Sequence, residues 1–174
     1  MTTKPLDKTK HDRKRFDCGI KALNNYLKMM ANQQSNRDNT RTFVLEDKDN
    51  PKYIIGYYTL TMTNLDLTSL PPNLQKKHQN STSSALIARL AVDKRYKKGF
   101  GEWLLVDALI KLLNASNSVA FPLIVVDAKD GALDFYKKFG FVSFLDEDKK
   151  LFITVDSVRK SFGEWWGCGI IIRK

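Results

Sequence analysis

Residues 90–102 read Leu-Ala-Val-Asp-Lys-Arg-Tyr-Lys-Lys-Gly-Phe-Gly-Glu, and this stretch decides the fold. Its first residues end an apolar segment typical of a buried strand, and the residues after Gly101 have the apolar spacing of a helix. A helix start presents unpaired backbone N–H groups and a partial positive charge, which together suit a phosphate. Glycines let the backbone come close to such a group, and the basic residues before Gly99 add positive charge. The stretch therefore predicts a strand, turn and helix that bind a phosphorylated ligand.

Further elements are predicted on both sides of this unit. Apolar spacing indicates helices over 16–31, 99–113 and 129–138, and strands over 42–45, 53–61, 85–92, 122–126, 141–144 and 151–155. The turn at 47–52 makes the first two strands a hairpin, and 66–84 is expected to be a long loop. Strand–helix–strand connections imply parallel neighbours, so the sheet should be mixed. The fold class is α+β (α/β), with a central sheet of about six or seven strands flanked by helices.

The length of 174 residues and the 43% hydrophobic content fit one domain over 1–174. Its core is expected over about 16–156, followed by an apolar C-terminal extension over 157–174. The segment 163–172, with two tryptophans and three isoleucines, is expected to be buried as an edge strand, as the cover of a face or in an oligomer contact.

The composition argues against several classes of protein. The longest apolar runs are far shorter than the ~18 residues of a membrane span, and charges from Lys4 to Arg15 leave no apolar segment for a signal peptide. Two cysteines without a CxxC pair indicate a reduced, cytoplasmic protein without a structural metal. Only two histidines are present, which argues against a histidine-based metal site or triad.

Positive charge is concentrated in two places. The formal net charge is +10, residues 1–41 hold ten basic and four acidic side chains, and a second basic cluster covers 94–98. Such fields attract nucleic acid, anionic lipid or phosphorylated cofactors. A lysine-rich surface that only aids solubility is the alternative, but the position of the second cluster beside the predicted phosphate turn favours a functional role.

Four segments together resemble one known family. They are Phe16-Asp17-Cys18-Gly19 with Leu23-Asn24 and Leu27, Gly56-Tyr57-Tyr58-Thr59-Leu60, Ala88-Arg89-Leu90-Ala91-Val92-Asp93, and Val126-Asp127-Ala128-Lys129-Asp130 leading to Phe135-Tyr136-Lys137-Lys138-Phe139-Gly140-Phe141. The family is the GNAT acetyltransferases, and the chain is most similar to the toxins of bacterial toxin–antitoxin modules of the TacT and AtaT type. One departure is that Tyr96 stands at the family's Gln/Arg position and the turn before Gly99 is one residue shorter than usual.

The resemblance implies the GNAT fold, splayed at the cofactor cleft, with acetyl-CoA as the cofactor. It implies a pantetheine arm that pairs with the strand ending at Val92, and these cofactor-binding residues: Leu90, Ala91, Val92, Lys97, Lys98, Gly99, Phe100, Gly101, Glu102 and Asp127. It also implies Tyr136 as the general acid that delivers a proton to the leaving thiolate. The alternative for Tyr136 is packing in the core of an amphipathic helix.

The toxin branch implies aminoacyl-tRNA as the acceptor, whose acetylated α-amino group blocks translation. The substrate-binding residues would be Arg15, Phe16, Cys18, Arg89, Lys94 and Arg95. No histidine or carboxylate pair is placed as a base, which fits an amine already partly neutral. Alternatives stay open for some of these segments: Asp17 as a helix cap, Arg89 paired with a carboxylate, and Cys18 as a packed thiol.

The resemblance also implies a ribbon-helix-helix antitoxin as partner and a homodimer. Two other functions remain possible from the sequence alone. One is a GNAT enzyme that acetylates a protein or small-molecule amine, and the other is a basic RNA- or partner-binding protein that has lost cofactor use. Acetylated aminoacyl product separates the first from the toxin, and binding of acetyl-CoA separates the second.

Overall fold

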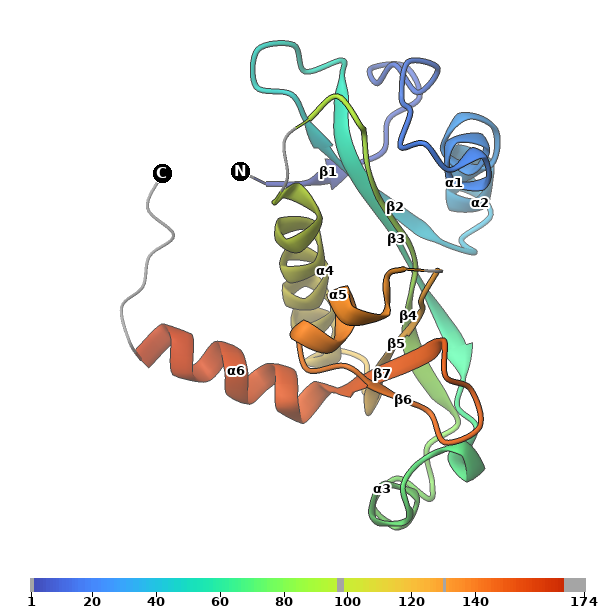
Figure 1. The fold of residues 1–174 in the computed structure, drawn as a ribbon, viewed down its shortest axis with the longest axis vertical. Helices are drawn as coiled ribbons and strands as arrows, with labels where there is room; N and C mark the ends of the chain where they lie inside the picture. The colour runs from blue at the N-terminus through green and yellow to red at the C-terminus, as the bar shows by residue number, and fades with distance from the viewer. Residues whose placement is uncertain (1, 97–98, 130, 168–174) are drawn as a thin grey trace. The chain divides into compact units, whose positions relative to one another are not determined.

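The computed structural model of the 174-residue chain describes residues 2–96, 99–129 and 131–167. Its seven strands form one sheet in the order β1-β2-β3-β4-β5-β7-β6 (Figure 1). The strands are β1 (Lys4–Pro5), β2 (Arg41–Glu46), β3 (Ile54–Asn64), β4 (Ser83–Val92), β5 (Leu123–Asp127), β6 (Val142–Ser143) and β7 (Lys150–Thr154). The helices are α1 (Lys21–Asn25), the π-helix η1 (Tyr26–Met30), α2 (Ala31–Asn36), the 3₁₀ helix η2 (Leu67–Ser69), α3 (Pro72–Lys77), α4 (Phe100–Ser116), α5 (Leu133–Lys138) and α6 (Val155–Gly167). The predicted mixed sheet with flanking helices is confirmed.

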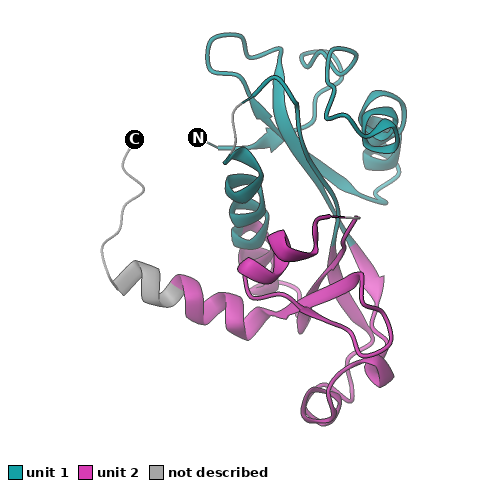
Figure 2. Ribbon diagram, in the orientation of Figure 1, with its two compact units in different colours: residues 1–61, 87–110 teal, residues 62–86, 111–174 magenta. Residues whose placement is uncertain are grey.

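The chain divides into two compact units, one with residues 1–61 and 87–110 and the other with residues 62–86 and 111–174 (Figure 2). Among the described residues, no helix is both long enough and apolar enough to cross a membrane.

In the first unit, α1 and α2 lie on one face of the sheet and α4 lies on the other (Figure 1). Strand β3 serves both faces because successive side chains point in opposite directions. Tyr57 faces α1 and donates a hydrogen bond to the carbonyl of Leu23 at 2.9 Å. Tyr58 faces α4 and donates to Asp107 at 2.5 Å, and the same carboxylate accepts from Thr3 at 2.6 Å.

In the second unit, β7 pairs antiparallel with both β5 and β6. The buried core on one side of these strands contains Leu70, Leu123, Val125, Phe144 and Phe152. Leucines from η2 and α3 pack against it, so this segment covers the core.

Two sequence predictions need correction, and one strand was not predicted. The segment expected as a loop over 66–84 contains η2, whose Asp66 accepts from the N–H of Thr68, and α3, which has a proline in its first turn. The helix expected from residue 16 begins at Lys21 and contains a π-helical turn. Strand β1 was not predicted, since two residues carry no periodicity.

At the C-terminus the structure bears on one of the three alternatives considered for residues 163–172, the edge strand. Residues 163–167 continue α6, so the edge strand considered for 163–172 does not form there; residues 168–172 lie outside the described residues. Helix α6 begins at Val155. Its start is stabilised because the Thr154 hydroxyl accepts a hydrogen bond from the N–H of Ser157 at 3.0 Å, which satisfies one unpaired donor of the helix start.

Candidate active site

The predicted phosphate turn lies in the first unit, between β4 and α4. Gly99 has a φ of +107°, a conformation that residues with a side chain rarely adopt. Its carbonyl accepts a hydrogen bond from the N–H of Trp103 at 3.1 Å, so the helix begins here. The backbone N–H groups of residues 100–102 therefore belong to the helix start, where an anion is stabilised. Lys97 and Lys98 lie outside the described residues.

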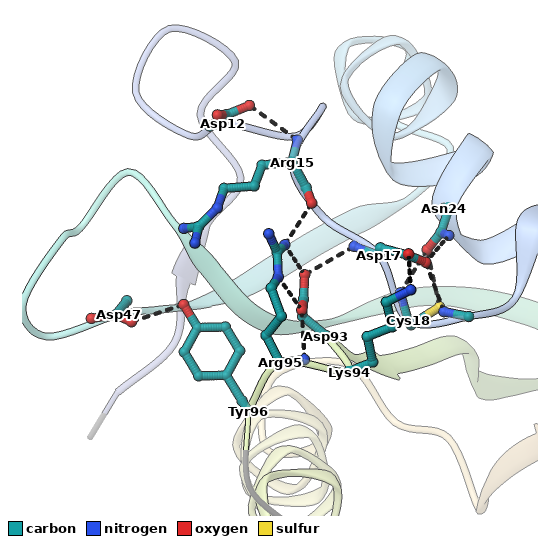
Figure 3. Close-up of polar contacts among 11 residues, drawn as sticks. Asp12, Arg15, Asp17, Cys18, Asn24, Asp47, Asp93, Lys94, Arg95 and Tyr96 are labelled. Carbon is teal, nitrogen blue, oxygen red and sulfur yellow. Dashed lines mark hydrogen bonds and ion pairs between the residues drawn. The ribbon is translucent and has the colours of Figure 1, made fainter.

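A buried carboxylate begins this turn. The side chain of Asp93 has no exposure to solvent and accepts the N–H of Asp17 at 2.9 Å, the N–H of Arg95 at 3.0 Å and Nε of Arg95 at 2.8 Å (Figure 3). A second guanidinium nitrogen of Arg95 contacts the other carboxylate oxygen. Burial opposes the charge of Asp93, but the hydrogen bonds from Arg95 and Asp17 outweigh burial and keep its pKa below the usual value.

Lys94 connects the turn to the segment before α1. Its ammonium lies 2.7 Å from Asp17 Oδ2, while Oδ1 of the same residue accepts hydrogen bonds from Gly19 N–H and the Asn24 amide. These contacts, with Lys94 the largest, hold the pKa of Asp17 well below its usual range. Asp17 is therefore not the cap of α1, whose N-cap residue is Ile20. Its carboxylate instead closes a turn three residues earlier.

Tyr96 ties the turn to the β2–β3 hairpin. Its hydroxyl donates to Asp47 at 2.8 Å (Figure 3). Its ring meets Phe100 edge-to-face, with the ring centres 6.4 Å apart. Burial, together with this hydrogen bond, raises the pKa of Tyr96 to about 12. The hydroxyl therefore stays protonated and the contact persists across the physiological pH range.

The predicted acceptor-side residues take varied positions in the first unit. Phe16 is only 1% exposed and packs edge-to-face on Tyr57. The Cys18 thiol is half-buried, lies 3.1 Å from Asn24 Oδ1, and burial raises its pKa, which suits a packed thiol. The guanidinium of Arg15 lies 3.4 Å above the Tyr53 ring.

Arg89 on β4 stacks on an aromatic ring. Its guanidinium lies 3.7 Å from the centre of the Tyr26 ring, so the ring, and not the carboxylate considered from the sequence, is its partner. The neighbouring Ala91 is buried in the core of the first unit, whereas Leu90 and Val92 are half-buried. Glu102 is exposed in the first turn of α4.

Tyr136 lies on α5 in the second unit and is 8% exposed. Its ring contacts Phe135 and Phe141 edge-to-face, at 5.1 and 5.7 Å. Burial raises the pKa of Tyr136 to about 12. The ring thus packs in the core, which was the alternative considered from the sequence. Its hydroxyl has no hydrogen-bond partner within the described part of the chain, so it can still donate a hydrogen bond to a ligand. Asp127 is exposed at the end of β5, opposite Lys150 on β7.

The arrangement thus brings together the β4–α4 turn and residues 15–19, which are far apart in the sequence. Sequence reasoning did not single out Asp93 or Asp47 as site residues. For Asp93 the available signal was an acidic residue directly before the basic run 94–98. Over the ranges that the structure describes, no group of three His, Cys, Asp or Glu side chains could hold a metal ion.

The family follows from comparison with known proteins. A model of the acetyltransferase (GNAT) family matches residues 10–141. The chain therefore belongs to this family, and the expected acetyl-CoA-dependent N-acetyltransferase activity and fold are confirmed.

Within the family, the chain is similar to toxins. It is 26% identical over 170 residues to the probable toxin TacT of Sinorhizobium fredii, covering 91% of this chain and 93% of the relative. It is 26% identical over 151 residues to the tRNA-acetylating toxin of Mycobacterium tuberculosis, covering 86% and 89%.

Solved structures agree with this grouping. A mutant of KacT superposes with a TM-score of 0.84 at 29% identity, over 92% of this chain and 98% of that one. AtaT complexed with acetyl-methionyl-tRNAfMet superposes with a TM-score of 0.83 at 28% identity, with the same coverage. A mutant of AtaT bound to acetyl-CoA and to the C-terminus of the antitoxin AtaR gives a TM-score of 0.78 at 26% identity, over 92% of this chain and 97% of that one.

Proposed function

We propose that this protein is a toxin that transfers an acetyl group from acetyl-CoA to the α-amino group of an aminoacyl-tRNA and so blocks translation. The observation that carries the proposal is the likeness, over 92% of the chain, to AtaT complexed with acetyl-methionyl-tRNAfMet. The positive charge of the first 41 residues supports an RNA substrate independently, since phosphate contacts dominate RNA affinity.

The residues present fit acetyl-CoA. The glycine-dependent start of α4 offers backbone N–H groups to its diphosphate, and residues 90–92 of β4 are the proposed strand beside its pantetheine arm. When bound, acetyl-CoA supplies the acetyl group as an activated thioester. Tyr136 holds a proton on its hydroxyl oxygen for the leaving sulfur, and its buried position keeps that proton in place until the transfer. The attacking amine must be neutral.

The rate should therefore rise with pH and show no fall from Tyr136 below about pH 12. The neutral phenol is the active form, and a pKa raised to about 12 means that this form is lost only as the pH passes that value. An α-amino group has a reference pKa of about 7.7–8.0, and an ester lowers it, so the rate should level off near neutrality. Initial rates between pH 6 and 9.5, corrected for hydrolysis of the ester, test this. A descending limb within that range that disappears in Tyr136→Phe would contradict it.

The direct test of the function is incubation with acetyl-CoA and a pool of charged tRNAs, followed by mass spectrometry of the released amino acids. We expect N-acetylated forms of one or a few amino acids. If only protein lysines or small amines become acetylated in parallel reactions, the substrate is wrong while the enzyme class stands.

Exposed lysines of the first unit should carry part of the tRNA affinity. Lys14 and Lys21 make no ion pair among the residues that the structure describes, whereas Lys4 is paired with Glu46 and Lys160 with Asp156. We expect Lys14→Gln with Lys21→Gln to weaken tRNA binding and to reduce the slope of log affinity against log salt by about 0.7–0.9 per lysine.

The double variant Lys4→Gln with Lys160→Gln is the matched control, because it removes the same charge from already paired positions. Binding is measured by fluorescence anisotropy at several salt concentrations. Equal losses in both double variants would show that net charge alone, and not a surface formed by Lys14 and Lys21, attracts the RNA.

The proposed partners follow from the same branch. A ribbon-helix-helix antitoxin is expected to bind and inhibit the enzyme, which a neighbouring gene for such a protein would support, and AtaT bound to part of AtaR is the parallel. A homodimer is proposed as the functional state, to be measured by light scattering. The cytoplasm is the proposed location because charged tRNA is used there.

A further inference from the structure

We propose that Asp93 and Arg95 are positioning residues that fix the cofactor turn against the segment 15–17, and that this clasp sets the affinity for the diphosphate of acetyl-CoA. The inference rests on the proposed acetyl-CoA site. In this proposal the two side chains act through the backbone of the turn, which gives Arg95 a role other than the substrate contact expected from the sequence. The clasp is defined as Asp93, Arg95 and the backbone of residues 15–17.

The clasp joins two segments that are 76 residues apart in the sequence. The carboxylate of Asp93 accepts a hydrogen bond from the N–H of Asp17 at 2.9 Å. It also accepts hydrogen bonds from two nitrogens of the Arg95 guanidinium. The same guanidinium donates to the carbonyl of Arg15 at 2.5 Å. Each segment therefore contributes a donor and an acceptor, and a fully buried carboxylate stands at the centre. Such charge-assisted, two-pronged contacts fix geometry better than single hydrogen bonds.

The backbone and Tyr96 continue the same connection. Lys94 N–H donates to the carbonyl of Asp17 at 2.9 Å, and Asp93 N–H donates to the carbonyl of Ile55 on β3 at 2.8 Å. Farther along the turn, the Tyr96 hydroxyl is held by Asp47. The turn is thus attached at each residue from Asp93 to Tyr96 (Figure 3).

This attachment matters because the turn is short. Only residues 93–98 separate the end of β4 at Val92 from Gly99. A shorter connection leaves less freedom to direct the N–H groups of residues 100–102 toward a diphosphate. A rigid start to the turn reduces the ordering that binding requires. The clasp supplies that rigidity in this chain.

The test compares two acetyl donors, acetyl-CoA and acetyl-pantetheine, of which only the first has a diphosphate. Asp93→Asn removes the charge of the clasp, and Arg95→Lys keeps the charge but loses the two-pronged geometry and the contact with Arg15. We expect KM for acetyl-CoA to rise about 10-fold or more in both variants with kcat changed less than about 2-fold, because uniform binding is lost. With acetyl-pantetheine, which lacks the nucleotide diphosphate, kcat/KM should stay within about 2-fold of the wild type.

Asp38→Asn is the control, since it removes the same charge from an exposed ion pair with Arg41. If kcat/KM falls equally with acetyl-CoA and acetyl-pantetheine, the clasp has only a general structural role. An unchanged KM for acetyl-CoA in Arg95→Lys would overturn the proposal. Calorimetric titration with CoA repeats the measurement without any acceptor. Weaker CoA binding in the variants therefore supports the clasp even if tRNA proves not to be the substrate, while a wild type that binds no CoA refutes the proposed site itself.

Discussion

Replacing Tyr136 with phenylalanine is expected to lower kcat about 10²- to 10⁴-fold, the range that a positioned proton donor contributes. The substitution removes one hydroxyl from a ring that packs between Phe135 and Phe141. Because that hydroxyl has no hydrogen-bond partner among the described residues, no buried group loses a partner when it is removed. The free energy of unfolding should therefore change by less than about 0.5 kcal/mol.

Tyr58→Phe is the matched control for this variant. The hydroxyl of Tyr58 donates to Asp107 at 2.5 Å and lies 3.1 Å from Thr3, so its removal should cost about 1–2 kcal/mol of stability and leave kcat unchanged. Tyr136→Phe is thus expected to lower kcat without changing stability, and Tyr58→Phe to lower stability without changing kcat. Single-turnover rates with saturating acetyl-CoA and urea unfolding measure the two quantities. A Tyr136→Phe enzyme with wild-type kcat would remove this phenol from the mechanism.

The sequence predicted those local structures of the candidate site that depend on neighbouring residues. A glycine before an apolar helix marks a helix start wherever it occurs, and Gly99 with its positive φ is placed there as expected. Tyr136 was proposed from a motif on one short helix, and the residue lies on such a helix, α5. In both cases the signal lies within a few residues of the feature that it predicts.

Contacts between distant segments could not be read in the same way. Nothing near Asp93 indicates that its carboxylate accepts the N–H of Asp17, because the pairing depends on how the segment before α1 lies on β4. Helix α3 was missed because six residues between prolines and serines are too few to show a helical pattern. Its function, which is to cover the core of the second unit with Leu74, becomes visible only in the structure. Helix α6 was missed because tryptophans and glycines suggested an apolar strand.

Gly56 illustrates the same limit and leads to the second large effect. The sequence pattern does not explain a glycine near the start of β3, but a Cβ at this position would lie 2.8 Å from the carbonyl oxygen of Ala91 and 2.6 Å from a methyl group of Leu104. Both distances are shorter than real Cβ contacts. The absence of a side chain lets β3 lie close to the end of β4, where residues 90–92 are proposed to meet the pantetheine arm.

Gly56→Ala should therefore destabilise the protein by roughly 3 kcal/mol, the upper end of overpacking. Reduced freedom of the unfolded chain favours alanine by only about 0.4–1 kcal/mol, which is too little to offset a collision with backbone. Any folded fraction should also bind acetyl-CoA more weakly, since the end of β4 must move. Urea unfolding and calorimetric titration with CoA measure the two effects.

The double variant Gly56→Ala with Leu104→Ala identifies which contact decides the cost. Shortening Leu104 relieves the contact with its methyl group but leaves the carbonyl oxygen of Ala91 where it is, since that atom belongs to the backbone of β4. Leu104 is fully buried, so its truncation alone should cost about 2–5 kcal/mol. If the backbone contact dominates, the costs of the two substitutions add and Leu104→Ala gives no rescue. A double variant as stable as Leu104→Ala alone would show that the side chain, and not the close approach of β3 to β4, requires glycine at position 56.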